Sequence, residues 1–126
     1  KVSSDYKYIQ VCVRRSLFNR NLSGTLFGGT MFSAADPFYA LMYWQNFAHQ
    51  YKQKVRVWLK AADIKYKRPA NKDMFLDFKL TQDDIEQAKH ALETSGKFNK
   101  EHEVELKDKH GDVYASVKLI VYVGLP

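Results

Sequence analysis

The sequence predicts an α+β domain in which an antiparallel sheet curves around one long buried helix. A stretch from about residue 29 to residue 50 is apolar on nearly every side, which is typical of a helix that is buried nearly all round. The segments that follow it alternate apolar and polar residues with the period of β-strands. Helix and strands are segregated along the chain rather than alternating, which favours an antiparallel sheet.

Length and composition fit one domain over residues 1–126. The chain is 45% hydrophobic and 27% charged, as ordinary globular proteins are, and a chain of this length buries roughly two-thirds of its unfolded surface. Its single cysteine, Cys12, excludes an internal disulfide and suits a reducing compartment; we expect it to be a buried strand residue. With no signal-like or membrane-length apolar run, a cytoplasmic protein is expected.

The first half of the chain is predicted to form two strands on either side of the helix. The first strand covers residues 6–17, and a turn rich in Asn, Ser and Gly separates it from the helix. Residues 55–67 form the second strand, and a change of apolar parity near Ala61 and Ala62 predicts a β-bulge. Pro69 ends this strand, because proline cannot donate a hydrogen bond to the ladder.

The second half supplies three more strands. Residues 74–80 alternate cleanly, and residues 81–93 begin with Thr and two acids, as a short capped helix does. A loop with one helical turn fits the latter segment nearly as well. Residues 97–108 and 113–123 form the last two strands, which a tight turn at the His-Gly-Asp of residues 110–112 joins.

Residues 21–36, NLSGTLFGGTMFSAAD, combine a turn, a glycine pair and a carboxylate at the expected start of the long helix. A helix N-terminus offers unpaired backbone N–H groups and the positive end of the helix dipole. Because glycine has no Cβ, a substrate carbonyl can approach the backbone at Gly28 and Gly29. We expect the Gly29 N–H to stabilise an oxyanion there.

Asp36 lies seven residues after Gly29, nearly two turns further along the same face if one helix spans both. A carboxylate among aromatic residues must be hydrogen-bonded or have its pKa raised, a cost that favours a functional role. The alternative is that Asp36 is an N-cap followed by a first-turn proline. If the helix instead begins near Gly29, Pro37 lies inside it and kinks it.

These motifs resemble those of the hotdog-fold thioesterases, most closely the phenylacetyl-CoA and other acyl-CoA thioesterases. The family pattern of Asn, Gly, His-Gly-Gly and an acid is present here as Asn21, Gly24, Phe27-Gly28-Gly29 and Asp36. A second family motif, a strand that ends in an aromatic residue, two further residues and proline, is present in DIKYKRPA of residues 63–70. The likeness covers residues 8–123. One departure is Phe27, which stands where many members have histidine.

The resemblance implies a hotdog fold and hydrolysis of an acyl-CoA or acyl-carrier thioester, with no cofactor other than the coenzyme A of the substrate. It implies Asp36 as nucleophile or general base, Gly29 as the oxyanion donor, and Asn21 as a residue that holds the loop or a water, unless Asn21 only forms an Asx-turn. The residues expected at the substrate are Phe27, Gly28, Ser33, Lys67 and Arg68.

Two of these residues have a chemical reason to bind coenzyme A. Lys67 and Arg68 lie at a strand end where family members often bind it, and the forked donors of Arg suit phosphate. Ser33 either donates to the Asp36 carboxylate or folds back on the helix. The resemblance also implies a homodimer or a dimer of dimers, joined sheet edge to sheet edge, with the site shared between protomers.

Other functions have weaker support. The formal charge of +6 comes with a basic cluster over residues 52–68, which fits nucleic acid, a phosphate-bearing ligand or a solvated face, but no base-stacking motif supports nucleic acid. The four histidines share no metal-ligand spacing, so they are expected on the surface or in strands, and no metal site is predicted. Asp63 is an alternative acid.

The main alternative function is a non-catalytic hotdog module that binds acyl groups or only dimerises, which the Phe27 variant favours slightly. A hotdog dehydratase is disfavoured, because residues 21–36 contain no histidine to pair with the carboxylate.

Overall fold

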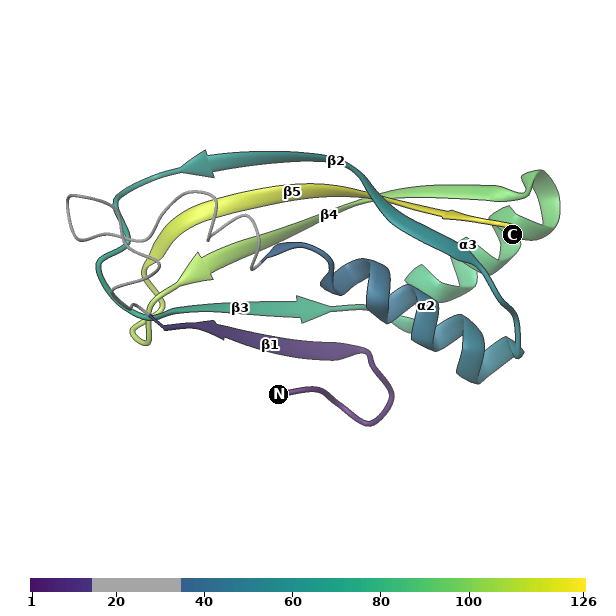
Figure 1. Ribbon diagram of the computed structural model, residues 1–126, viewed down its shortest axis with the longest axis horizontal. Coiled ribbons are helices and arrows are strands. Elements are labelled where there is room, and N and C mark those ends of the chain that lie inside the picture. The colour runs from purple at the N-terminus through teal and green to yellow at the C-terminus, as the bar shows by residue number, and fades with distance from the viewer. Residues whose placement is uncertain (15–34) are drawn as a thin grey trace.

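The computed structural model describes residues 1–14 and 35–126. In these residues a five-stranded antiparallel sheet, in the order β1-β3-β4-β5-β2, curves over helix α2 (Figure 1). A second helix, α3, lies at the end of the sheet where β4 begins. The strands are β1 Tyr8–Val13, β2 Arg56–Tyr66, β3 Met74–Lys79, β4 Lys97–Lys107 and β5 Val113–Gly124, and the helices are α2 Phe38–Tyr51 and α3 Gln82–Ser95.

The core lies between α2 and the concave face of the sheet. The helix contributes buried residues at intervals of three and four, which place them on one face: Tyr39, Met42, Tyr43, Asn46 and Phe47. The sheet meets this face with alternate residues of its strands, including Leu76 and Phe78 of β3 and Val117 of β5. Full burial of each such side chain contributes about 1.5–3 kcal/mol.

Helix α2 begins later than the sequence predicts. Its N-cap is Pro37, whose carbonyl accepts the N–H of Leu41 at 3.1 Å. Asp36 and Pro37 therefore lie in a bend before α2, and the prediction that Pro37 lies inside one helix running from residue 29 to residue 50 is wrong. Proline disfavours helical conformation in the residue before it, so a helix begins after it more readily than it passes through it.

The outer face of α2 is exposed, which also differs from the prediction. Leu41 is 37% exposed and Trp44 is 48% exposed. The apolar composition of the segment predicts burial on all sides, but the sheet covers the helix from one side only. The apolar residues of the other face are consequently left uncovered in a single copy of the chain.

Two predicted local features are confirmed. The register between β2 and β5 shifts between Leu59 and Ala61, so the bulge lies one residue from the predicted position. The segment after β3 is a helix rather than a loop, because Thr81 and Asp84 form a capping box in which each side chain accepts the backbone N–H of the other, at 3.0 and 3.1 Å.

Two side chains lie at a different depth from that expected. Cys12 is exposed rather than buried. His102 is a strand residue as predicted, but it is only 8% exposed, with its ring stacked on Tyr39 at 4.1 Å between centroids. Its Nε2 lies 2.8 Å from the hydroxyl of Tyr43. Burial lowers the pKa of His102 to about 4.

We predict that the protein loses stability between about pH 6.5 and pH 4 because of His102. The folded-state pKa of about 4 lies below the ordinary value of 6.5, so the unfolded chain takes up a proton in this range and the folded chain does not. The contribution of the neutral ring is complete above pH 6.5 and is lost as the pH falls to 4; its full size is on the order of 3 kcal/mol.

Urea unfolding of the wild type and of His102→Gln, measured across this pH range, checks the prediction. We expect the difference in free energy of unfolding between the two proteins to change with pH by about this amount. An unchanged difference would assign the pH dependence to other groups.

Candidate functional site

Asp36 is the one predicted catalytic side chain that the described residues contain. It is partly buried, between the buried Ala35 and the exposed Pro37. It does not cap α2, because the N-cap is Pro37 and no side chain makes a cap hydrogen bond there; the capping interpretation is therefore wrong. Nor does it lie two turns inside a helix, because α2 begins after it.

The N-terminus of α2 follows Asp36 directly. The N–H groups of its first turn have no partner within the helix, and no acidic residue lies in that turn. Backbone donors at the positive end of a helix dipole attract an anion or a developing oxyanion. The described residues thus place a carboxylate next to a set of backbone donors.

Five other predicted site residues lie outside the described residues: Asn21, Phe27, Gly28, Gly29 and Ser33. The roles expected for them remain predictions.

Lys67 and Arg68 leave the end of β2 and are held against β5. Their backbone N–H groups both donate to the carbonyl of Tyr114, at 2.9 and 3.2 Å. The guanidinium of Arg68 lies over the Tyr114 ring at 4.5 Å, and its Nε donates to the carbonyl of Val113 at 3.3 Å. Its side chain is still half exposed, so the fork is held in place while part of it faces solvent.

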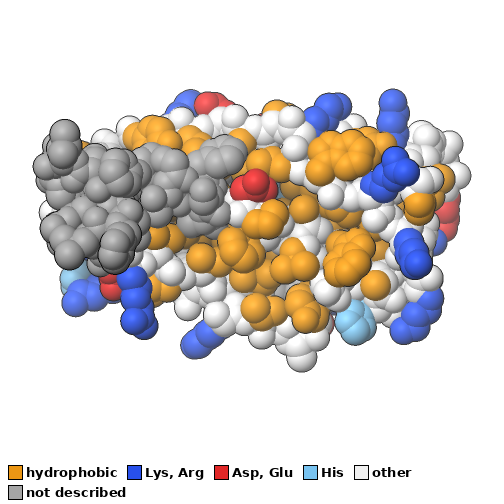
Figure 2. Space-filling view, viewed as in Figure 1, with side chains coloured by type: hydrophobic (Ala, Val, Ile, Leu, Met, Phe, Trp, Pro, Cys, Tyr) orange, Lys and Arg blue, Asp and Glu red, His pale blue; other side chains and the backbone are white. Residues whose placement is uncertain are grey.

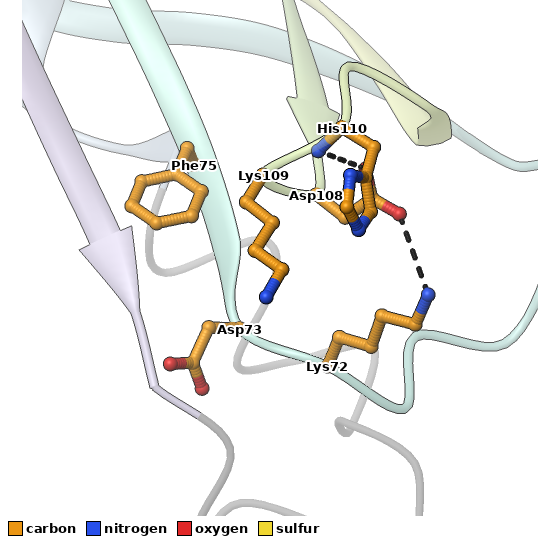
Figure 3. A pocket seen from close by; sticks show the side chains of 6 residues that line it. All are labelled: Lys72, Asp73, Phe75, Asp108, Lys109 and His110. Carbon is orange, nitrogen blue, oxygen red and sulfur yellow. Dashed lines mark hydrogen bonds and ion pairs between the residues drawn. The ribbon is translucent and has the colours of Figure 1, made fainter.

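A polar pocket of about 390 Å³ lies at the turn between β4 and β5, and the sequence did not predict it. Figure 3 shows lysine side chains from two segments extending into it, with His110 beside Asp108. Its lining residues are Lys72, Asp73, Phe75, Asp108, Lys109 and His110. The only sequence signal is the density of charge around the turn, which a solvated loop also shows.

Asp108 organises this turn. Its carboxylate is 3% exposed and accepts the N–H groups of His110 and Asp112 at 2.8 and 3.1 Å and the hydroxyl of Tyr114 at 3.2 Å. Lys72 lies 3.7 Å away. Burial raises the pKa of Asp108, but these donors and the Lys72 charge outweigh burial and leave the pKa below its usual value. Its oxygens are occupied, which fits a structural role.

The remaining candidates do not assemble into a site. Asp63 is exposed on β2, away from the apolar surroundings that would raise the pKa of a catalytic acid. Within residues 1–14 and 35–126, no group of three or more His, Cys, Asp or Glu side chains is arranged to hold a metal. In the same residues, neither helix combines the length and the hydropathy that crossing a membrane requires.

Residues 1–123 match the family described as "Domain of unknown function (DUF4442)". The chain belongs to the DUF4442 family. No protein of curated function matches it.

Solved structures similar to this DUF4442 protein share its fold. PA5026 of Pseudomonas aeruginosa, described as a probable thioesterase, is 19% identical, with a TM-score of 0.81 over 94% of this chain and 76% of that one. The smu.793 protein of Streptococcus mutans, solved with acetyl-CoA, is 15% identical, with a TM-score of 0.69 over 98% and 87%. PaaI of E. coli, from a phenylacetic acid degradation operon, is 14% identical, with a TM-score of 0.66 over 95% and 74%. The predicted hotdog fold is confirmed.

We predict that Asp108 matters more for stability than Asp112, its neighbour in the turn. Asp108→Ala leaves two backbone N–H groups and a buried hydroxyl without their acceptor, and we expect the melting temperature to fall by roughly 5 °C or more. Asp112→Ala removes a half-exposed contact with Arg68 at 4.0 Å, which contributes little. Differential scanning calorimetry of both variants measures the contrast, and equal shifts would contradict the assignment.

Proposed function

We propose that this DUF4442 protein hydrolyses acyl-CoA or acyl-carrier thioesters, with Asp36 as nucleophile or general base. The observation that carries the proposal is the partly buried Asp36 carboxylate directly before the donor-bearing N-terminus of α2. The fold supports it, since PA5026 is described as a probable thioesterase and smu.793 binds acetyl-CoA.

The chemistry requires a group that attacks the thioester carbon or activates water, together with a donor for the oxyanion. As a nucleophile, Asp36 bonds to the acyl carbon while the C–S bond breaks, and water then hydrolyses the mixed anhydride. As a base, Asp36 takes a proton from a water whose hydroxide attacks the same carbon. In both routes the Gly29 N–H, and next to Asp36 the free N–H groups of α2, stabilise the oxyanion.

The coenzyme A portion of the substrate fits the end of the molecule to which β2 leads. Lys67 and the half-exposed fork of Arg68 are positioned there by hydrogen bonds to β5. Lys72 and Lys109 add positive charge in the adjacent pocket. A diphosphate and a ribose phosphate are the ligands that such a group of cations recognises.

The second candidate is a non-catalytic module that binds acyl groups or coenzyme A, and the phenylalanine at position 27 is the feature that favours it. It predicts that coenzyme A raises the melting temperature while no thioester is hydrolysed.

We expect Asp36→Asn to lower kcat/KM at least 100-fold for every thioester that the wild type hydrolyses. The substitution preserves size and leaves the hydrogen bonds of α2 intact, so stability and coenzyme A binding should change little. Thiol release from a panel of acyl-CoAs measures the activity, with the exposed acid variant Asp63→Asn as the matched control. Equal activity of Asp36→Asn and wild type would remove Asp36 from the mechanism.

We also propose that two copies pair through β2 to form a homodimer, alone or within a dimer of dimers. The outer edge of β1 is covered, because Val2 bridges Ile9 and the terminal amino group of Lys1 donates to the carbonyl of Gln10 at 2.9 Å. No described strand pairs with the outer edge of β2. A long open edge is a template for pairing with another chain.

A symmetric register suits this edge. If Ala61 lies opposite Ala62 of a second copy, two small exposed residues meet and Lys60 lies opposite Asp63. Opposite charges in such cross-strand positions stabilise the pairing. The exposed Cys12 thiol suits a reducing compartment, and we propose that the protein is cytoplasmic.

Charge exchange tests the register. We expect Lys60→Glu to shift the dimer towards monomer, because it places like charges opposite each other, and the double variant Lys60→Glu/Asp63→Lys to restore the dimer. Light scattering after size exclusion measures the mass of each protein. A monomeric wild type, or a double variant no more dimeric than the single one, would overturn this interface.

A further inference from the structure

We propose that a groove between α2 and β2 binds the acyl chain as an extended hydrocarbon, and that Trp44 sets the chain length that fits. This inference rests on the proposed function and names its substrate class, a straight acyl chain of medium length. The groove has a volume of about 360 Å³, within the range of small-molecule sites. It is lined by Pro37, Ala40, Leu41, Trp44, Val55 and Val57.

The lining of the groove is entirely apolar. Figure 2 shows hydrophobic side chains gathered in the middle of this face of the molecule, over α2. Leu41 and Trp44 are the large residues that α2 leaves exposed here, and monomeric proteins rarely leave such contiguous apolar surface without a use. A polar or charged acyl group would lose its hydration in this groove and gain no hydrogen-bonding side chain in return.

The groove begins next to the candidate catalytic carboxylate. Pro37, which lines it, follows Asp36 directly, and the residues from α2 lie at positions 37, 40, 41 and 44, along one face of the helix. An acyl group whose carbonyl carbon lies at Asp36 can therefore run along α2 towards Trp44. The coenzyme A portion then extends the other way, to Lys67 and Arg68 at the far end of β2.

The helix geometry gives the length of the chain. Pro37 and Trp44 are seven residues apart, which is about 10 Å along the axis at roughly 1.5 Å per residue. A fully extended chain advances about 3.5 Å over three bonds, so roughly nine bonds span this distance. Chains of about eight to ten carbons should fill the groove as far as the Trp44 ring.

The groove and the proposed dimer do not compete for the same atoms. Pairing at the β2 edge uses backbone groups in the plane of the sheet, whereas the groove lies under the sheet, between Val57 and α2. We therefore assign the groove to the acyl chain and the edge to the second copy.

Steady-state kinetics with straight-chain acyl-CoAs of two to sixteen carbons test the proposal. For the wild type, kcat/KM should rise about twofold to fourfold per methylene up to eight to ten carbons and then stop rising. In Trp44→Ala we expect the optimum to move to longer chains, with the ratio of sixteen-carbon to eight-carbon activity raised at least tenfold.

Trp58→Ala is the matched control. Trp58 is 47% exposed, almost as much as Trp44, but its ring stacks on Tyr122 with centroids 4.2 Å apart and does not line the groove. Its chain-length profile should equal that of the wild type. The same profile in the wild type and Trp44→Ala would overturn the proposal, including the case in which Trp44→Ala only dissociates the dimer.

A binding measurement separates this inference from the proposed function. The chain has two tryptophans, so in Trp58→Phe the fluorescence reports on Trp44 alone. We expect S-decyl-CoA, a thioether that cannot be hydrolysed, to shift this emission to the blue saturably, and S-ethyl-CoA to leave it unchanged. A shift without turnover of any thioester would support the groove and refute the thioesterase. Turnover with no shift would refute the groove alone.

Discussion

The architecture depends on one constraint: the sheet covers α2 from one side only. The inner face of the helix, from Tyr39 to Phe47, supplies the core against β3, β4 and β5. The same coverage leaves Leu41 and Trp44 on an outer face that water does not favour. The core, the groove and the reason for a ligand or second copy on this side all follow from an apolar helix wider than the surface that covers it.

Pro37 connects this helix to the candidate chemistry. Because it cannot donate a hydrogen bond and restrains the residue before it, α2 starts at Phe38 and Asp36 stays outside the helical hydrogen-bond ladder. A side chain in a bend can point at a bound group without disturbing a packed helix. The free N–H groups of the first turn then lie beside the carboxylate, which is an arrangement suited to acyl transfer.

The two ends of the molecule differ in polarity along β2. Beyond Tyr66 the chain enters a region of fixed charges, in which Asp108 holds the turn and Arg68 is held over Tyr114. Towards Arg56 the strand faces the apolar side of α2. A thioester of coenzyme A has the same division, since a phosphate-rich portion and a hydrocarbon portion meet at the reacting carbonyl, and Asp36 lies between the corresponding regions.

The sequence by itself determined the elements of this fold and their class. Alternation in the strands, the parity change near Ala61 and the Thr81 cap are local signals, because each is set by residues close together in the chain. The motif resemblance likewise indicated Asp36 and Arg68. For Asn21, Gly29 and the other site residues between positions 15 and 34, the sequence is still the whole basis for their roles.

Only the tertiary structure decided what is buried and what lies together. The burial of His102 depends on Tyr39 and Tyr43 of a helix about sixty residues away in the chain, and no local pattern contains that contact. The exposure of Trp44 depends on which side of α2 the sheet occupies, which an all-apolar helix does not encode. The start of α2 was open because Asp-Pro fits both an N-cap and a bend; the packed structure places the helix after the proline and leaves Asp36 free to act.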